Sequence, residues 1–173
     1  VDPVSTDRMP VLNPASVEQV GEVASGGEAD VDRAVAAAEA AFEQFSLSSK
    51  AERLDLLARI RAVTERRFEE LAQAMRLEMG APISMSRDAQ ADAAIGHLDG
   101  FVAALEKLEE QERFENGEVL FREPIGVCGL ITPWNWPMNQ VVLKVLPVIA
   151  TGCTCVLKPS EHTPVSAMLY AEI

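Results

Sequence analysis

A stiff loop rich in tryptophan and proline contains the first side chain that could take part in chemistry. Asn135 lies between two tryptophans and two prolines in Pro133-Trp134-Asn135-Trp136-Pro137, shortly after an apolar run. An amide held by a rigid loop can donate a hydrogen bond to the oxyanion that develops during acyl chemistry. Asparagine is also a favoured cap for the first turn of a helix. The sequence leaves both roles open for Asn135.

A second loop, Lys158-Pro159-Ser160-Glu161, follows another apolar run and places a cation near a carboxylate. In a dinucleotide-binding unit, an acidic residue after the second strand accepts hydrogen bonds from the adenosine ribose. Glu161 is placed for that task, and Lys158 is a neighbouring donor to the same hydroxyls. Since a carboxylate repels a 2′-phosphate, NAD is favoured over NADP. An ordinary exposed ion pair would explain the same residues, and Gly126-Val127-Cys128-Gly129 does not match the G-x-G-x-x-G phosphate turn.

The cysteines and histidines predict no metal centre. Cys153 and Cys155 could form half of a metal site, but no second cysteine pair or histidine cluster accompanies them. We therefore expect these two residues and Cys128 to be buried, inert thiols. Three cysteines cannot form a disulfide framework, which fits a reducing, cytoplasmic location. No Ser, His and Asp set resembles a hydrolase signature.

Both loops must be positioned by buried strands. We expect a strand over Ile125–Ile131 that is covered on both faces, a helix over Asn139–Thr151 and a second buried strand over Thr154–Leu157. Thr163-Pro164 starts a final helix, because proline is tolerated in the first turn. This order predicts a right-handed parallel βαβ unit. Two strands alone leave apolar edges and faces open, so the sequence is expected to be cut short after Ile173.

The preceding residues predict helices after short strands and turns over Val11–Ala24. Apolar residues then recur at spacings of three and four, with Asp30 or Asp32 placed to favour the start of the first helix. A capping box at Ser49 opens a second helix, which is expected to run through Met75 to Gly80.

A third helix and a hairpin complete this part. Apolar residues from Ile95 to Leu108 define the helix, and the acidic run after Glu106 is expected to be its solvated end. Asn116-Gly117, before an alternating stretch, is a hairpin signal.

Composition bounds the function classes. The 173 residues match one domain, and 48 % are apolar, enough for a sizeable core. A net charge of −12 and a pI near 4.6 are unlike a protein that binds nucleic acid or an anionic membrane. No stretch approaches 18 uninterrupted apolar residues, so no membrane span is predicted.

Taken together, the motifs resemble the aldehyde dehydrogenase superfamily over at least Phe121 to Ile173. The order and spacing of several runs carry the resemblance, and two matching loops in order are a specific signal. The family's first turn itself lacks the glycine fingerprint. The matching runs are Glu123-Pro124-Ile125-Gly126-Val127, Thr132-Pro133-Trp134-Asn135-Trp136-Pro137, Ala150-Thr151-Gly152-Cys153-Thr154 and Lys158-Pro159-Ser160-Glu161-His162-Thr163-Pro164.

The resemblance implies an α/β fold in three parts. Residues 1–113 are the N-terminal helical part of the cofactor-binding domain. Residues 114–124 form a ribbon that contributes to oligomerisation, as a homodimer or homotetramer. Residues 125–173 begin a Rossmann-like, parallel βαβ NAD-binding core, which is incomplete.

Site residues follow from the same resemblance. Asn135 corresponds to the family's oxyanion-stabilising amide, and Lys144 to a lysine with a supporting charge-relay role in some members. An alternative for Lys144 is a surface lysine of its helix. The residues implied to bind NAD, with NADP less favoured, are Ile131, Thr132, Pro133, Trp134, Asn135, Lys158, Pro159, Ser160 and Glu161.

The implied reaction oxidises a small-molecule aldehyde to a carboxylic acid through a cysteine thiohemiacetal and a thioester. The family's nucleophilic cysteine, its general-base glutamate and its pyrophosphate-binding glycine motif lie downstream of this region and are absent from the 173 residues. Two alternatives stay open. One is a non-catalytic relative with a binding or structural role, and the other is an acylating dehydrogenase that transfers the acyl group to coenzyme A.

Overall fold

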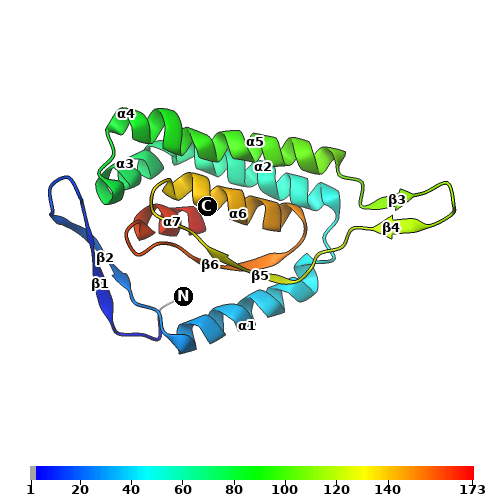
Figure 1. The fold of residues 1–173 in the computed structure, drawn as a ribbon, viewed down its shortest axis with the longest axis horizontal. Helices are drawn as coiled ribbons and strands as arrows, with labels where there is room; N and C mark the ends of the chain where they lie inside the picture. Colours follow the sequence, from blue (N-terminus) through cyan, green and yellow to red (C-terminus); the bar gives the residue numbers. More distant parts are fainter. Residues whose placement is uncertain (1–2) are drawn as a thin grey trace.

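A computed structural model describes residues 3–173 and arranges them in layers around a parallel strand pair (Figure 1). The pair consists of β5 (Val127–Ile131) and β6 (Thr154–Lys158), with α1 (Glu28–Phe45) on one side. On the other side lie α6 (Pro137–Ala150) and α7 (Pro164–Ala171). The outer helices are α2 (Lys50–Arg66), α3 (Phe68–Met79) and α5 (Asp92–Lys107). The predicted α/β class with a parallel βαβ unit is confirmed.

The register of the strand pair places both candidate loops at one edge. Val127 pairs with Thr154 at one end, and Ile131 pairs with Lys158 at the other. Because the strands are parallel, the segments that follow Ile131 and Lys158 leave the sheet side by side. This edge is where open parallel sheets bind ligands.

Two antiparallel hairpins extend from the layered body (Figure 1). The N-terminal hairpin pairs β1 (Arg8–Leu12) with β2 (Gln19–Ala24), as the predicted strands and turns suggested. The second pairs β3 (Gln111–Arg113) with β4 (Val119–Phe121) and projects away from the helices. The hairpin expected at Asn116-Gly117 is therefore confirmed.

Local capping signals begin the first two helices. Asp30 lies in the first turn of α1, and its carboxylate accepts hydrogen bonds from the backbone N–H groups of Gly27 and Val4. At α2, Ser49 Oγ accepts from the Glu52 N–H at 3.2 Å, while the Glu52 carboxylate accepts from the Ser49 N–H at 2.8 Å. The bonds between Asp30 and Gly27 and between Ser49 and Glu52 each span three residues, so both signals could be read from the sequence, whereas the bond to Val4 could not.

The prediction of one helix from the capping box through Met75 is wrong. The chain breaks at Arg67, whose φ of −100° and ψ of 12° separate α2 from α3. After the break α3 packs on α7, whereas α2 packs on α5. The Arg67 guanidinium donates to Glu70 and to Glu172. Tertiary packing therefore overrides a continuous helical pattern at this point.

The segment before the third helix is also irregular. A short turn, α4 (Ile83–Met85), leads into a π-helical segment, η1 (Ser86–Ala91), which continues into α5. Ser86 and Gln90 are buried within it. No sequence signal predicted this wider turn.

The hydrophobic core lies between α6 and the outer helices. Its largest fully buried side chains include Leu57 of α2, Leu71 and Met75 of α3, Leu98 of α5 and Leu146 of α6. Within residues 3–173 no helix is both long and apolar enough to cross a membrane.

The first core strand has helices on both faces, α1 on one and α6 on the other, as expected. The cover is incomplete at its ends, since Ile131, the last residue of β5, is 74 % exposed and Ile125, which precedes the strand, is 89 % exposed. None of the strands described in residues 3–173 flanks the pair, so its edges are open.

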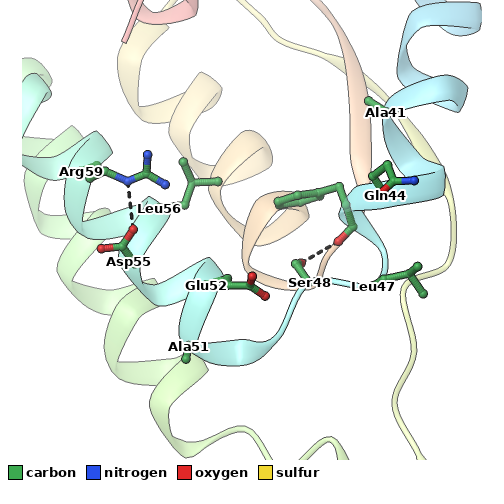
Figure 2. Close-up of a pocket in the computed structure, with 10 residues that line it drawn as sticks. Ala41, Gln44, Leu47, Ser48, Ala51, Glu52, Asp55, Leu56 and Arg59 are labelled. Atoms are coloured by element: carbon green, nitrogen blue, oxygen red, sulfur yellow. Dashed lines mark hydrogen bonds and ion pairs between the residues drawn. The ribbon is translucent and has the colours of Figure 1, made fainter.

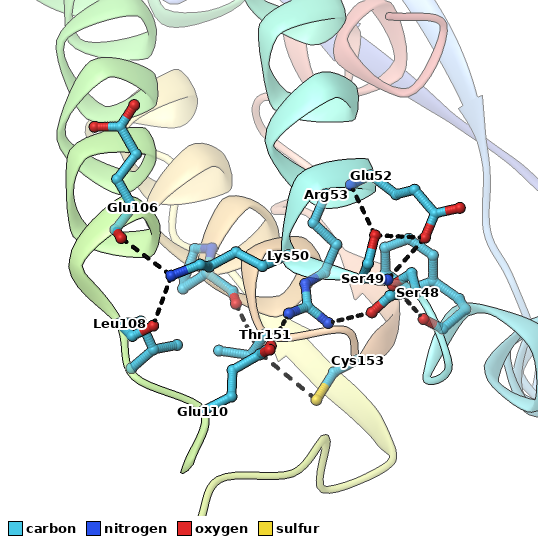
Figure 3. A network of polar contacts seen from close by, with 12 residues as sticks. Ser48, Ser49, Lys50, Glu52, Arg53, Glu106, Leu108, Glu110, Thr151 and Cys153 are labelled. Atoms are coloured by element: carbon cyan, nitrogen blue, oxygen red, sulfur yellow. Dashed lines mark hydrogen bonds and ion pairs between the residues drawn. The ribbon is translucent and has the colours of Figure 1, made fainter. Parts of the chain in front are cut away.

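A buried arginine bonds α2 to the segment that leads into β3 and lies close to the turn before β6 (Figure 3). Arg53 is 3 % exposed, and its guanidinium donates to the Ser48 carbonyl at 2.8 Å and to the Glu110 carboxylate. Gly152 has a φ of +76°, and a Cβ there would lie 2.9 Å from Arg53 Nη1. Lys50 Nζ donates to the Glu106 and Leu108 carbonyls at the end of α5, where a cation is favourable. The acidic run after Glu106 is therefore not only the solvated end of α5, because it also accepts hydrogen bonds from Lys50 and Arg53 of α2.

Replacing Gly80 by alanine is expected to lower the free energy of unfolding by about 2 kcal/mol. Gly80 ends α3 with a φ of +68°, and an added Cβ would lie 2.8 Å from Pro14 Cγ. Chemical denaturation of the intact protein measures the effect. Gly96→Ala is the matched control, because Gly96 is helical with no neighbour within 4 Å of an added Cβ. Equal stability of the two variants would contradict the expected strain.

Candidate active site

The two candidate loops meet at the carboxyl edge of β5 and β6. The Thr132 N–H donates to the Lys158 carbonyl at 3.3 Å, so the first residue after β5 is tied to the last residue of β6. Thr132 is 4 % exposed, whereas Pro133, Trp134 and Asn135 are exposed. The buried threonine fixes the base of a loop whose tip is open to solvent.

The Asn135 side chain is not used to cap the next helix. The cap position of α6 is Trp136, which makes no side-chain capping bond, and Pro137 begins the helix. Asn135 makes no hydrogen bond to any of residues 3–173. The capping role considered for Asn135 is therefore wrong, and its amide N–H groups are free to donate to a ligand.

The second loop is compact and carries an ion pair. Lys158 Nζ lies 3.1 Å from Glu161 Oε2, and both side chains are exposed. Ser160 is buried, and its Oγ accepts from the His162 N–H at 3.2 Å, while the Thr163 N–H donates to the Ser160 carbonyl. These bonds fold the loop between β6 and α7.

Glu161 is an ionised acceptor at neutral pH. Its own backbone N–H and then the Lys158 ammonium lower the pKa of the Glu161 carboxyl. An exposed ion pair of this kind contributes little to stability, because solvent screens the two charges. The negative charge of Glu161 is thus available to a ligand at the carboxyl edge of β5 and β6.

Lys144 lies apart from the two loops. It is half-buried in the middle of α6 and forms no ion pair within the part of the chain that the structure describes. It lies seven positions after Pro137, which corresponds to about 10 Å along the helix axis. The structure does not bring its ammonium group into contact with Asn135.

Two of the three cysteines, Cys128 and Cys155, are thiols without nucleophilic activation. Cys128 and Cys155 are neighbours in the strand register, and Cys153 is buried beside Thr151. Burial raises the pKa of both the Cys128 and the Cys155 thiols, which keeps them protonated at neutral pH. Cys128 and Cys155 are only partly buried, in contrast to the full burial expected for them.

Residues 3–173 hold no group of three or more His, Cys, Asp or Glu side chains that could bind a metal ion. The two histidines lie apart. His97 Nε2 contacts Asn139 Oδ1 at 2.7 Å, whereas His162 lies beside Glu161. They therefore serve separate local contacts.

A cavity of about 700 Å³ adjoins the two loops and includes a residue that sequence reasoning missed. Trp134 and Glu161 line it together with the N-terminal hairpin and Glu78 at the end of α3. Glu78 is 2 % exposed, and burial raises the pKa of its carboxyl to about 7. A glutamate near a helix end gives no sequence signal of burial, because its partners lie on α7, far along the chain.

A second cavity, of about 790 Å³, lies between the end of α1 and the start of α2 (Figure 2). Most of its polar side chains are already engaged. Asp55 pairs with Arg59 at 3.0 Å, and Ser48 Oγ donates to the Phe45 carbonyl at 2.6 Å. Glu52, on the same wall, belongs to the capping box of α2. The Gln44 amide also lines this cavity and makes no hydrogen bond within residues 3–173, but an amide is neither a nucleophile nor a general acid or base.

Comparison with known proteins gives a consistent result along the whole chain. The model of the aldehyde dehydrogenase family matches residues 1–173. A 3-succinoylsemialdehyde-pyridine dehydrogenase from a Pseudomonas species is 45 % identical over 174 residues, which cover 100 % of this chain and 36 % of that protein.

Solved structures agree in fold. A variant of aldehyde dehydrogenase C from Pseudomonas syringae, crystallised with NAD⁺ and octanal, superposes with a TM-score of 0.96 at 50 % identity, covering 99 % of this chain and 35 % of that one. An aldehyde dehydrogenase from Bartonella henselae gives a TM-score of 0.96 at 42 % identity, covering 99 % and 37 %. The chain spans about 36 % of the length of the curated relatives it matches.

Proposed function

The chain belongs to the aldehyde dehydrogenase family, and from this we propose that it forms part of an NAD-dependent enzyme that oxidises an aldehyde to a carboxylic acid. The observation that carries the proposal is the meeting of two loops at one strand edge, with a free Asn135 amide on one and the Lys158–Glu161 pair on the other. The nucleophilic cysteine and general-base glutamate of the resemblance are not among these 173 residues.

The second loop fits a dinucleotide, because its ionised Glu161 can accept hydrogen bonds from a ribose diol while Lys158 donates to the same hydroxyls. Pro159 and Ser160 shape this loop. Ile131, Thr132, Pro133 and Trp134 would contact the nicotinamide side from the first loop. When bound, NAD supplies the hydride acceptor.

Asn135 has the role of an oxyanion donor in this proposal. When a thiolate adds to an aldehyde carbon, the electrons of the carbonyl bond move to oxygen, which becomes negatively charged. A fixed amide N–H aimed at that oxygen stabilises the charge more than it stabilises the neutral aldehyde. Lys144 would act at longer range, through the charge of its ammonium group.

Oxidation of octanal by the intact protein tests the proposed function, since this aldehyde is bound by the Pseudomonas syringae relative. We expect reduced NAD and octanoate to form in equal amounts. Product that appears only with coenzyme A, as an acyl thioester, would favour the acylating alternative. Binding of NAD without turnover of any aldehyde in a broad panel would favour the non-catalytic alternative.

The β3–β4 hairpin is proposed to contribute to a homodimer or homotetramer. It projects from the body, and Phe114, Leu120 and Phe121 are exposed on it at 45 %, 40 % and 60 %. An exposed apolar arm of this kind is typical of an association surface.

Replacing Glu161 by glutamine is expected to narrow the preference for NAD over NADP by about tenfold. The Glu161 carboxylate accepts hydrogen bonds from the ribose hydroxyls and repels a 2′-phosphate. The uncharged glutamine amide is a weaker acceptor and does not repel the phosphate. The ratio of kcat/KM for the two cofactors measures the effect. Glu39→Gln, an exposed position on α1, is the matched control. Unchanged KM values for both cofactors would count against the ribose assignment.

A further inference from the structure

Glu78 is a buried carboxylate that the proposed chemistry does not use. It lies in the last turn of α3 and accepts hydrogen bonds from the Val165 N–H at 2.6 Å, the Ser166 N–H at 3.2 Å and Ser166 Oγ. All three donors belong to the first turn of α7. A side chain of α3 thus caps the N-terminus of α7.

The helix that Glu78 contacts has no cap of its own. The cap residue of α7, Thr163, makes no side-chain capping bond, and Pro164 at the first position has no N–H. The N–H groups of Val165 and Ser166 are the next donors without a helical partner, and Glu78 accepts from both. A negative charge at this end is also favoured by the helix dipole. Glu78 therefore replaces the missing N-cap.

The capped turn is the end of the candidate ribose-binding loop. Residues 158–163 connect β6 to α7, and Thr132 holds the β6 end of this loop through the Lys158 carbonyl. Glu78 holds the α7 end. It also lines the same cavity as Trp134 and Glu161.

We propose that Glu78 is a positioning residue, which clamps the first turn of α7 and thereby holds the 158–163 loop in the conformation that binds the adenosine ribose of NAD. The inference rests on the proposed function for the identity of the ligand. It requires the acceptor oxygens of Glu78, since an amide presents one acceptor oxygen and turns N–H donors toward the N–H groups of α7. Val165 and Ser166 would then lose at least one of their bonds.

The test combines kinetics with hydrogen exchange on the intact protein. We expect Glu78→Gln to raise the KM for NAD about tenfold, the size of one lost charge-assisted hydrogen bond, with kcat and the KM for aldehyde within about twofold. Amide exchange of residues 160–166 should also become about tenfold faster. Ser166→Ala, which keeps both backbone bonds, should give a smaller change of the same sign.

Glu69→Gln is the matched control, because Glu69 is an exposed carboxylate on the same helix that bonds Arg87 and does not contact α7. It should change neither the KM for NAD nor the exchange of the loop. An unchanged exchange rate in Glu78→Gln, or faster exchange with an unchanged KM for NAD, would overturn the positioning role. If the wild type binds NAD but oxidises no aldehyde, the proposed function alone fails. The dissociation constant for NAD then replaces KM in the same comparison.

Discussion

Replacing Asn135 by alanine in the intact protein is expected to lower kcat for aldehyde oxidation by about 10²–10³-fold, the range found when one oxyanion donor is removed. The loss should fall on kcat, because the amide meets a full negative charge only after the nucleophile has added to the aldehyde. Steady-state rates at saturating NAD and aldehyde measure it. The KM for NAD should change much less.

The isosteric change Asn135→Asp is expected to reduce kcat at least as much, since a carboxylate has no N–H and repels the oxyanion. Asn116→Ala, in the exposed turn of the β3–β4 hairpin, is the control for loss of an asparagine side chain. Near-normal turnover of Asn135→Ala would remove the oxyanion role. A rise in the KM for aldehyde alone would instead indicate ground-state binding.

The surroundings of Asn135 explain why a large effect is expected from an exposed side chain. The preceding Thr132 is buried and bonded to Lys158, and the following Pro137 begins α6. The loop is therefore fixed at both ends, and the amide has no competing partner in residues 3–173. The backbone that carries the amide is thus held in place, which limits the reorganisation needed when charge develops.

Local signals were the ones that the sequence could predict. The capping box at Ser49, the turn at Asn116-Gly117 and the proline that begins α7 each act over a few residues, so their residue types determine the outcome. Parallel pairing of β5 and β6 followed from the strand–helix–strand order. The edge that gathers the two loops was predictable for the same reason.

Contacts between distant segments were not predictable. The break at Arg67 depends on packing of α3 against α7, and a continuous apolar pattern cannot show it. Arg53 and Glu78 look like ordinary surface charges in the sequence, yet both are buried by partners more than fifty residues away. The exposure of β5 follows from what lies beside the strand, not from its own residues.

Glu78 combines a cost to stability with a proposed benefit to ligand binding. Removing a carboxylate from water disfavours its charged form, and the three bonds from α7 only partly offset this, so the pKa stays raised to about 7. Proteins commonly keep such a cost where activity needs a polar group in a buried place. The stability of this site should therefore respond to pH in the direction opposite to that of a salt-bridged carboxylate.

The free energy of unfolding of the wild type, relative to Glu78→Gln, is expected to fall by about 3 kcal/mol between pH 4 and pH 8. Glu78 ionises near pH 4.5 in the unfolded chain but near pH 7 in the fold, so the folded state binds more protons between these values. The stabilising contribution is complete below about pH 4.5 and is lost as the pH rises through about 7. Denaturant titrations of both proteins across this range measure it.

Comparison with the variant isolates Glu78 from its neighbours, because Glu161 and His162 in the same cavity are present in both proteins. For Glu69→Gln we expect a pH dependence of the opposite sign, since the guanidinium of Arg87 lowers the pKa of Glu69 to about 2. The free energy of unfolding of the wild type, relative to Glu69→Gln, should therefore rise as the pH rises. If Glu78 shows that same trend, the hydrogen bonds from Val165 and Ser166 outweigh its desolvation. The carboxylate would then stabilise the fold at neutral pH, and the proposed cost of keeping it would not exist.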